Sequence, residues 1–234
     1  MAINISTLKI RALTSLIFVA VMMTGLLWNE WSFLLLFIVI HAGCWIEFIG
    51  LVKRIYGTKH LGYTLLGLLY ITLPICLMID LRMNWSNIMA GYDQGGHGNT
   101  LPLAIILSIW VNDTMAYLVG SVIGRTPFSS ISPKKTWEGT IGGAILSVVV
   151  MGYVFPLLSK SFFYHGFHQS VYFLLAAICA IAGTAGDLLE SKLKRMANVK
   201  DSGAIMPGHG GFLDRFDSLL VAIPFAWLFI KLFV

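Results

Sequence analysis

Seven apolar segments separated by short polar connections constrain the fold of this chain more than any other feature. Most approach the ~20 residues that a helix needs to cross a bilayer, and the first and last are shorter. Of the 234 residues, 57% are hydrophobic and only 12% are charged, whereas soluble domains carry roughly 25% charge. We therefore predict an all-α polytopic membrane protein of about seven transmembrane helices, with six to nine compatible with the pattern. The segments are about 12–27, 31–52, 61–80, 101–120, 139–159, 168–187 and 218–234.

The basic residues predict how the chain lies in the membrane. With the N-terminus in the cytoplasm, thirteen lysines and arginines fall on the inner side, and only Arg82, Lys160 and Lys231 fall outside. The net charge of +5 is thus explained by loops beside anionic lipid, which argues against nucleic-acid binding. No stretch suggests a soluble domain, so residues 1–234 are predicted to form one integral membrane domain. Its first part, 1–100, holds few motifs, and 101–234 holds the polar clusters.

Charged residues concentrate where a membrane protein should have few. The stretch from Asp187 to Asp217 holds five acidic and five basic residues between two apolar segments. Mixed charge beside a bilayer is costly and is usually kept for function. Carboxylates, lysines, arginines, a histidine and paired glycines are the groups that metal-assisted phosphate chemistry uses.

Two further polar clusters fall on the same predicted cytoplasmic side. The first is Asn112 and Asp113 within the fourth segment, where a carboxylate costs ~2.5–3.5 kcal/mol on insertion scales. It either lines a site or only forms hydrogen bonds between helices. The second, before the fifth segment, either contacts lipid headgroups or supplies donors for a phosphate and a charge partner. Its candidate residues are Ser132, Lys134, Lys135, Thr136 and Glu138.

Polar residues stand at helical spacing in two places within this charged stretch. Asp187, Glu190, Ser191 and Lys194 stand at i, i+3, i+4 and i+7, which places them on one helical face. Glu190 and Lys194 are also explained as a surface ion pair. Asp214, Asp217 and Ser218 recur at i, i+3 and i+4, beside Arg215. Between the two, the glycine-rich run 207–211 can expose backbone N–H groups to a phosphate.

These residues predict metal-assisted chemistry on a nucleotide. Asp187 and Asp214, at two helix ends, can hold one or two hard cations such as Mg²⁺ through oxygen. His209 lacks a second histidine or cysteine at ligand spacing, which argues against zinc. Bound Mg²⁺ would neutralise a triphosphate, and lysine and arginine would hold its other oxygens. The chain contains no GxxxxGK[ST] and no GxSxG motif.

The residues from Ser191 to Asp217, which we call the signature segment, carry a resemblance. Ser191-x-Leu193-Lys194-Arg195, Lys200-Asp201 and PxHGGFxDRFD over 207–217 are similar to the signature of the phosphatidate cytidylyltransferase (CDP-diacylglycerol synthase) family. Asn112-Asp113, SPKKTWEG with Gly142-Gly143, and Gly186-Asp187-Leu188 resemble other landmarks of that family. Met206 departs from the usual Leu, Ile or Phe, a swap of similar volume. Family members also tend to be longer, with eight or nine spans.

The resemblance implies that CTP and phosphatidate give CDP-diacylglycerol and pyrophosphate, with Mg²⁺ required. It also implies a homodimer and a second cation such as K⁺. A bacterial plasma membrane, with the site facing the cytoplasm, is the expected location. Asp187 and Asp214 match the family's metal-holding acids. The candidate catalytic residues are Asp187, Lys194, Arg195, Lys200, Asp201, His209, Asp214, Arg215 and Asp217, and the candidate substrate-binding residues are Asn112, Asp113, Ser132, Lys134, Lys135, Thr136, Glu138, Ser191, Gly210 and Gly211.

Other classes of protein share some of these features. A transporter or channel also places charge within spans, but it should show broken helices in two similar halves. A lipid kinase that uses CTP, or a synthase acting on another lipid phosphate, would share the chemistry. A purely structural membrane scaffold would need neither Asp187 nor Asp214.

Overall fold

The computed structural model describes the chain except residues 1–4, 84–99, 164–166 and 206–209, and the side chains of 5–11 and 160–163. The described residues fold into helices α1 (Ile5–Leu27), α2 (Glu30–Tyr56), α3 (His60–Thr64), α4 (Leu73–Met83), α6 (Thr100–Ile123), α7 (Trp137–Phe163), α8 (Gln169–Met196) and α9 (Leu213–Phe233). Two compact units form. Unit 1 comprises Met1–Thr72 and Lys192–Phe216, and unit 2 comprises Leu73–Ser191 and Asp217–Val234.

The prediction of a helical polytopic membrane protein is confirmed. Among the described residues, five stretches are long and apolar enough to cross a bilayer, and a shorter apolar helix covers Ala12–Leu27. The five are Glu30–Thr64, Thr100–Ile123, Trp137–Ser159, Gln169–Met196 and Leu213–Phe233.

The segment predicted at 61–80 is helical but not uniform. It contains α3, a π-helical turn over Leu68–Thr72 and the start of α4. Pro74 stands in the first turn of α4, directly after the π-helical turn, where a residue without a backbone N–H is tolerated. Breaks in the α-helical pattern are common beside proline and at π-helical turns. The span count from sequence therefore depends on how this broken stretch is counted.

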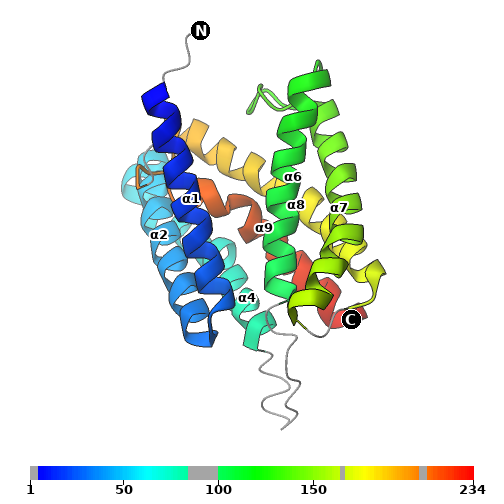
Figure 1. Ribbon diagram of the computed structural model, residues 1–234. Coiled ribbons are helices and arrows are strands. Elements are labelled where there is room, and N and C mark those ends of the chain that lie inside the picture. The colour runs from blue at the N-terminus through cyan, green and yellow to red at the C-terminus, as the bar shows by residue number, and fades with distance from the viewer. Residues whose placement is uncertain (1–4, 84–99, 164–166, 206–209) are drawn as a thin grey trace. The chain divides into compact units, whose positions relative to one another are not determined.

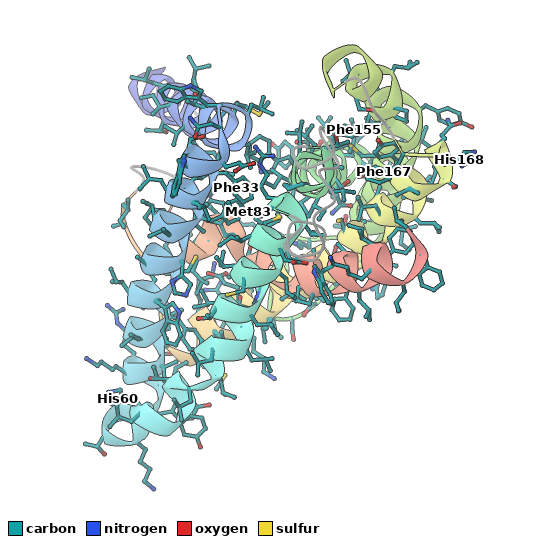
Figure 2. All side chains as sticks on the ribbon, turned by 90° about the horizontal axis from the view of Figure 1, so that it is seen from below. Phe33, His60, Met83, Phe155, Phe167 and His168 are labelled. Atoms are coloured by element: carbon teal, nitrogen blue, oxygen red, sulfur yellow. The ribbon has the colours of Figure 1, made fainter. Side chains whose placement is uncertain are left out.

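In unit 1, α1 and α2 run side by side (Figure 1). A capping box starts α2: Asn29 Oδ1 accepts from Ser32 N at 2.8 Å, and Ser32 Oγ accepts from Asn29 N at 3.0 Å. Figure 2 shows Phe33 near this start of α2 and His60 beyond its other end. The buried face of α2 includes Phe33 and Phe37, whose ring centroids are 4.6 Å apart.

In unit 2, α6 and α7 lie against each other along their length (Figure 1). Glycines make this possible: a Cβ on Gly139 would lie 2.8 Å from Ala116 O, and one on Gly143 would lie 2.5 Å from Ala116 Cα. Ser147 Oγ also donates to Ser108 O at 3.1 Å. Small residues at a helix interface permit this close packing.

Aromatic side chains pack around Tyr172 near the start of α8. Phe155 and Phe167, both labelled in Figure 2, pack on the ring of Tyr172. The hydroxyl of Tyr172 accepts from Phe167 N at 3.1 Å. Farther along α8, a Cβ on Gly186 would lie 2.5 Å from Asp217 O, so α8 and α9 approach closely within unit 2.

Candidate active site

Asp214, in the first turn of α9, is the centre of a polar cluster in unit 1. Its Oδ1 accepts from Lys194 Nζ at 2.6 Å, and both side chains are nearly buried. Its Oδ2 accepts from the backbone N–H groups of Ser202 and Gly211, each at 2.8 Å. A carboxylate at the first turn of a helix is also favoured by the helix dipole. The structure thus brings together three parts of the signature segment around one acid.

Glycines leave the room that this cluster needs. Gly210 has φ +83°, a left-handed conformation that favours glycine, and a Cβ there would lie 2.6 Å from Asp214 Oδ2. A Cβ on Gly211 would overlap the carboxylate of Glu47. The candidate binding residues Gly210 and Gly211 therefore shape the loop around two carboxylates, and their contact with substrate stays a prediction.

Glu47, near the middle of α2, is a residue that sequence reasoning missed. Glu47 is only 7% exposed, and it lies in an apolar stretch that is long enough to cross a membrane. Glu47 Oε1 accepts from Phe212 N at 2.9 Å, and Oε2 accepts from Leu213 N at 2.9 Å. The signal was present, because a lone carboxylate within an apolar segment is costly unless it has partners.

In unit 2, the second predicted acid has a lysine partner. Asp187 on α8 forms an ion pair with Lys135, which lies just before α7. The pairing joins two of the polar clusters that the sequence placed on one side of the membrane. Glu190, one turn later on α8, is fully buried. The prediction that 187, 190, 191 and 194 lie within one helix is confirmed, because α8 continues to Met196.

Lys135 is carried by an ordered hairpin, residues 125–137. Phe128 N donates to Lys135 O at 2.7 Å, and Trp137 N donates to Thr126 O at 3.0 Å. A tight turn closes it, since Lys135 N donates to Ser132 O at 3.1 Å. Lys134 is exposed at this turn.

Two candidate residues of the second cluster have local partners in this hairpin. Thr136 Oγ1 accepts from Gly139 N at 3.1 Å, as a side chain does when it caps a helix. Glu138 Oε1 accepts from Thr126 Oγ1 at 2.8 Å, and Oε2 accepts from Arg125 N at 3.2 Å. Both therefore hold the hairpin that presents Lys135, while their binding of substrate stays a prediction.

The remaining candidates differ in exposure. Asn112 is buried, and its Oδ1 has no hydrogen-bond partner among the described residues, whereas Asp113 is exposed. Asp217 is buried and its Oδ1 accepts from Ser218 N at 2.6 Å. His209 lies outside the described residues. Four candidate catalytic residues of the signature segment are exposed: Arg195, Lys200, Asp201 and Arg215.

The donor chemistry of these clusters fits Mg²⁺. Asp187 and Asp214 offer carboxylate oxygens, the donors that Mg²⁺ prefers, and each is paired with a lysine ammonium that a metal ion would have to displace. Within the described part of the chain, no three histidine, cysteine or acidic side chains gather in one place. The prediction that Asp187 and Asp214 are metal ligands stays a prediction.

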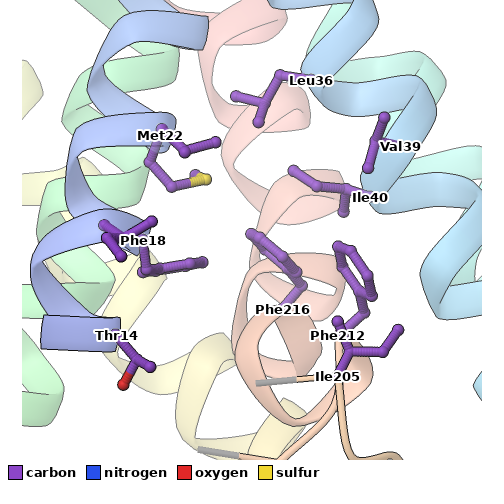
Figure 3. Close-up of a pocket in the computed structure, with 11 residues that line it drawn as sticks. Thr14, Phe18, Met22, Leu36, Val39, Ile40, Ile205, Phe212 and Phe216 are labelled. Atoms are coloured by element: carbon purple, nitrogen blue, oxygen red, sulfur yellow. The ribbon is translucent and has the colours of Figure 1, made fainter. Parts of the chain in front are cut away.

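An apolar pocket of about 300 Å³ lies in unit 1, next to the signature segment. Figure 3 shows Phe18 and Met22 from α1, Val39 and Ile40 from α2, and Phe212 turned toward this space. Val39 at 48% exposure is accessible from outside, whereas Ile40 is buried. The pocket has the size of small ligand sites and a lining suited to a hydrocarbon chain.

Together, the apolar helices and the carboxylate–lysine cluster of each unit define a multi-pass membrane protein with polar clusters suited to phosphate chemistry. The profile of the Cytidylyltransferase family matches residues 59–233. The chain belongs to the Cytidylyltransferase family.

Curated relatives agree with this assignment. A phosphatidate cytidylyltransferase of Rickettsia bellii is 33% identical over 224 residues, which cover 94% of this chain and 89% of the relative. One from Staphylococcus aureus is 38% identical over 191 residues, covering 79% of this chain and 70% of the relative. One from Bacillus subtilis is 37% identical, covering 78% of this chain and 63% of the relative. The family that the signature segment predicts is thus confirmed.

Proposed function

We propose that this protein transfers the cytidylyl group of CTP to phosphatidate, which forms CDP-diacylglycerol and pyrophosphate for phospholipid synthesis. The observation that carries the proposal is the signature segment, whose separate parts meet at Asp214 through Lys194, Ser202 and Gly211. Phosphatidate cytidylyltransferases that are 33–38% identical to most of this chain support the same reaction.

The reaction needs positioning and charge neutralisation more than covalent help from the protein. A phosphate oxygen of phosphatidate attacks the α-phosphorus of CTP and forms a new P–O bond. The bond from the α-phosphorus to the oxygen that bridges to the β-phosphorus breaks. Its electron pair leaves with pyrophosphate, so no oxidant or further reactant is required.

Acidic and basic side chains would have different roles in this reaction. Asp187 and Asp214 would hold Mg²⁺, with a second cation such as K⁺ as a further part of the proposal. The metal supplies charge neutralisation of the triphosphate. Lys194, whose ammonium lies on Asp214, and Lys135, whose ammonium lies on Asp187, can turn to phosphate oxygens. The exposed Arg195, Lys200 and Arg215 of unit 1 would add contacts to phosphate oxygens, and Asn112 and Asp113 of unit 2 would contact substrate.

The proposal also covers the cellular location and the oligomeric state of the enzyme. CTP is a cytosolic nucleotide, and the basic loops predict that the polar clusters face the cytoplasm. The bacterial relatives support a plasma-membrane location. A homodimer is part of the proposal on the strength of the family resemblance.

The apolar pocket of unit 1 supports a lipid substrate, and we assign it to an acyl chain of phosphatidate. Val39→Phe, at the exposed side of the pocket, is expected to lower kcat/KM several-fold for long-chain phosphatidate and little for a dihexanoyl form. Ile38→Phe is the matched control, because Ile38 is exposed on α2 and does not line the pocket. Equal effects on both chain lengths would remove this assignment.

The direct test uses the purified full chain in detergent, with phosphatidate, Mg²⁺ and CTP labelled at the α-phosphate. We expect label in the lipid phase, dependent on both Mg²⁺ and phosphatidate. A CTP-dependent lipid kinase would instead transfer label only from the γ-phosphate. Folded protein that transfers neither label would contradict the proposal.

A further inference from the structure

The carboxylate of Glu47 joins α2 to the signature segment across 165 positions of sequence. It accepts from two consecutive backbone N–H groups, those of Phe212 and Leu213, where α9 begins. These groups have no partner within a helix, because the first turn of a helix lacks preceding carbonyls. Glu47 therefore acts as an N-terminal cap supplied by another helix.

Ser202 connects this cap to the candidate metal-binding acid. Its Oγ lies 2.7 Å from Glu47 Oε2 and 2.8 Å from Asp214 Oδ2, so one hydroxyl proton serves two carboxylates. Ser202 N also donates to Asp214 Oδ2 at 2.8 Å. Any displacement of Glu47 is thereby transmitted to the groups that orient Asp214.

The surrounding glycines show that the position of Glu47 is built into the loop. A Cβ on Gly203 or on Gly211 would overlap the Glu47 carboxylate. By contrast, a Cβ on Gly50, one turn further along α2, meets nothing within 4 Å. Gly203, directly after Ser202, and Gly211, shortly before α9, thus leave the space that this side chain occupies.

We infer that Glu47 is a positioning residue of the site: from α2, it holds Ser202 and the start of α9 so that Asp214 keeps its orientation. Residue 47 lies before the part of the chain that matches the family profile, 59–233. The inference rests on the proposed function for its catalytic consequence, whereas the hold on α9 stands independently. Groups that orient a metal ligand typically contribute 10–100-fold to metal affinity or activity.

The first experiment measures how Glu47 stabilises the start of α9, and it does not depend on enzymatic activity. Backbone amide exchange is followed by mass spectrometry on the full chain in detergent, in peptides that contain Phe212 and Leu213. Glu47→Ala is expected to raise exchange there roughly tenfold, because two hydrogen bonds to a charged group are lost. Glu30→Gln, on an exposed carboxylate of the same helix, should leave it unchanged. Unchanged exchange in Glu47→Ala would overturn the inference.

The second experiment separates positioning from folding. Glu47→Gln keeps the shape of the side chain, but its amide can accept at one atom only, so kcat should fall roughly 10–100-fold and half-saturating Mg²⁺ should rise. KM for CTP should change little, and Glu47→Asp should recover part of kcat. Full activity in Glu47→Gln at wild-type Mg²⁺ would also overturn the inference.

A double-mutant cycle tests the space that the carboxylate occupies. Gly203→Ala should impair the wild type but add little to Glu47→Ala, whereas Gly50→Ala should be silent in both backgrounds. Additive losses would overturn the inference. If the wild type transferred no label, the proposed function would fail, and amide exchange would still decide whether Glu47 holds α9.

Discussion

At the scale of residues, the carboxylates of this membrane protein differ in what holds them. Asp187 and Asp214 each face a lysine ammonium. Glu47 instead accepts from backbone N–H groups at the start of a helix. Asp80 on α4 accepts from Trp227 Nε1 at 2.7 Å and lies 3.1 Å from Lys231 Nζ, which ties α4 to α9 in unit 2. The indole and ammonium partners of Asp80 and the backbone partners of Glu47 suit fixed structure.

A first prediction concerns the two candidate metal ligands. Asp187→Asn and Asp214→Asn keep the size of the side chain but remove the charge that Mg²⁺ needs, so each should lower transfer at least roughly 100-fold. Asp80→Asn is the matched control, and it should retain transfer and the Mg²⁺ requirement while lowering thermal stability. Activity within a few-fold of wild type at low Mg²⁺, in either of the first two variants, would show that the residue is not a metal ligand.

At the scale of elements, local sequence predicted the helices well and their partners less well. The close contact of α6 with α7 depends on the glycines at 139 and 143, because only a missing Cβ permits backbones to approach so nearly. The hairpin 125–137 was not foreseen. Its backbone bonds, such as the one from Phe128 N to Lys135 O, depend on how the connection turns back on itself, which hydropathy periodicity does not report. The break near Pro74 was also missed, because hydropathy does not distinguish π turns from α turns.

The α6–α7 contact gives a prediction about stability. Gly143→Leu would place a side chain where a Cβ already lies 2.5 Å from Ala116 N and Cα, and overpacking of this kind costs about 1–3 kcal/mol. We expect the melting temperature of the detergent-solubilised protein to fall by about 5 °C. Gly62→Leu, at a position with nothing within 4 Å, should leave it unchanged. Equal shifts in both variants would mean that the contact adds nothing to stability.

At the scale of the whole molecule, the two compact units divide the chain unevenly. The signature residues Lys192–Phe216 belong to unit 1 with the N-terminal helices, whereas Asp187 belongs to unit 2. Two helices, α8 and α9, each contribute residues to both units. The sequence also predicts that residues 101–234 hold the functional motifs and that residues 1–100 hold few. This division stays a prediction.

Membrane orientation belongs to this scale and can be tested with introduced thiols. In a variant without Cys44, Cys76 and Cys179, Lys134→Cys places a thiol at the exposed hairpin turn, on the predicted cytoplasmic side. An impermeant maleimide should label it only after cells are permeabilised. Val234→Cys, at the exposed C-terminus, should be labelled in intact cells if an odd number of spans follows a cytoplasmic N-terminus. The reverse pattern would invert the orientation.

The sequence by itself determined the class of protein, its helices and its family. The length of an apolar segment indicates directly whether it can cross a bilayer, and the signature segment is a local pattern of fixed spacings. The tertiary structure decided which groups meet: Lys135 with Asp187, Lys194 with Asp214, and Glu47 with the start of α9. Periodicity describes neighbours along one helix, whereas a hydrogen bond between residues 165 positions apart depends on how the whole chain packs.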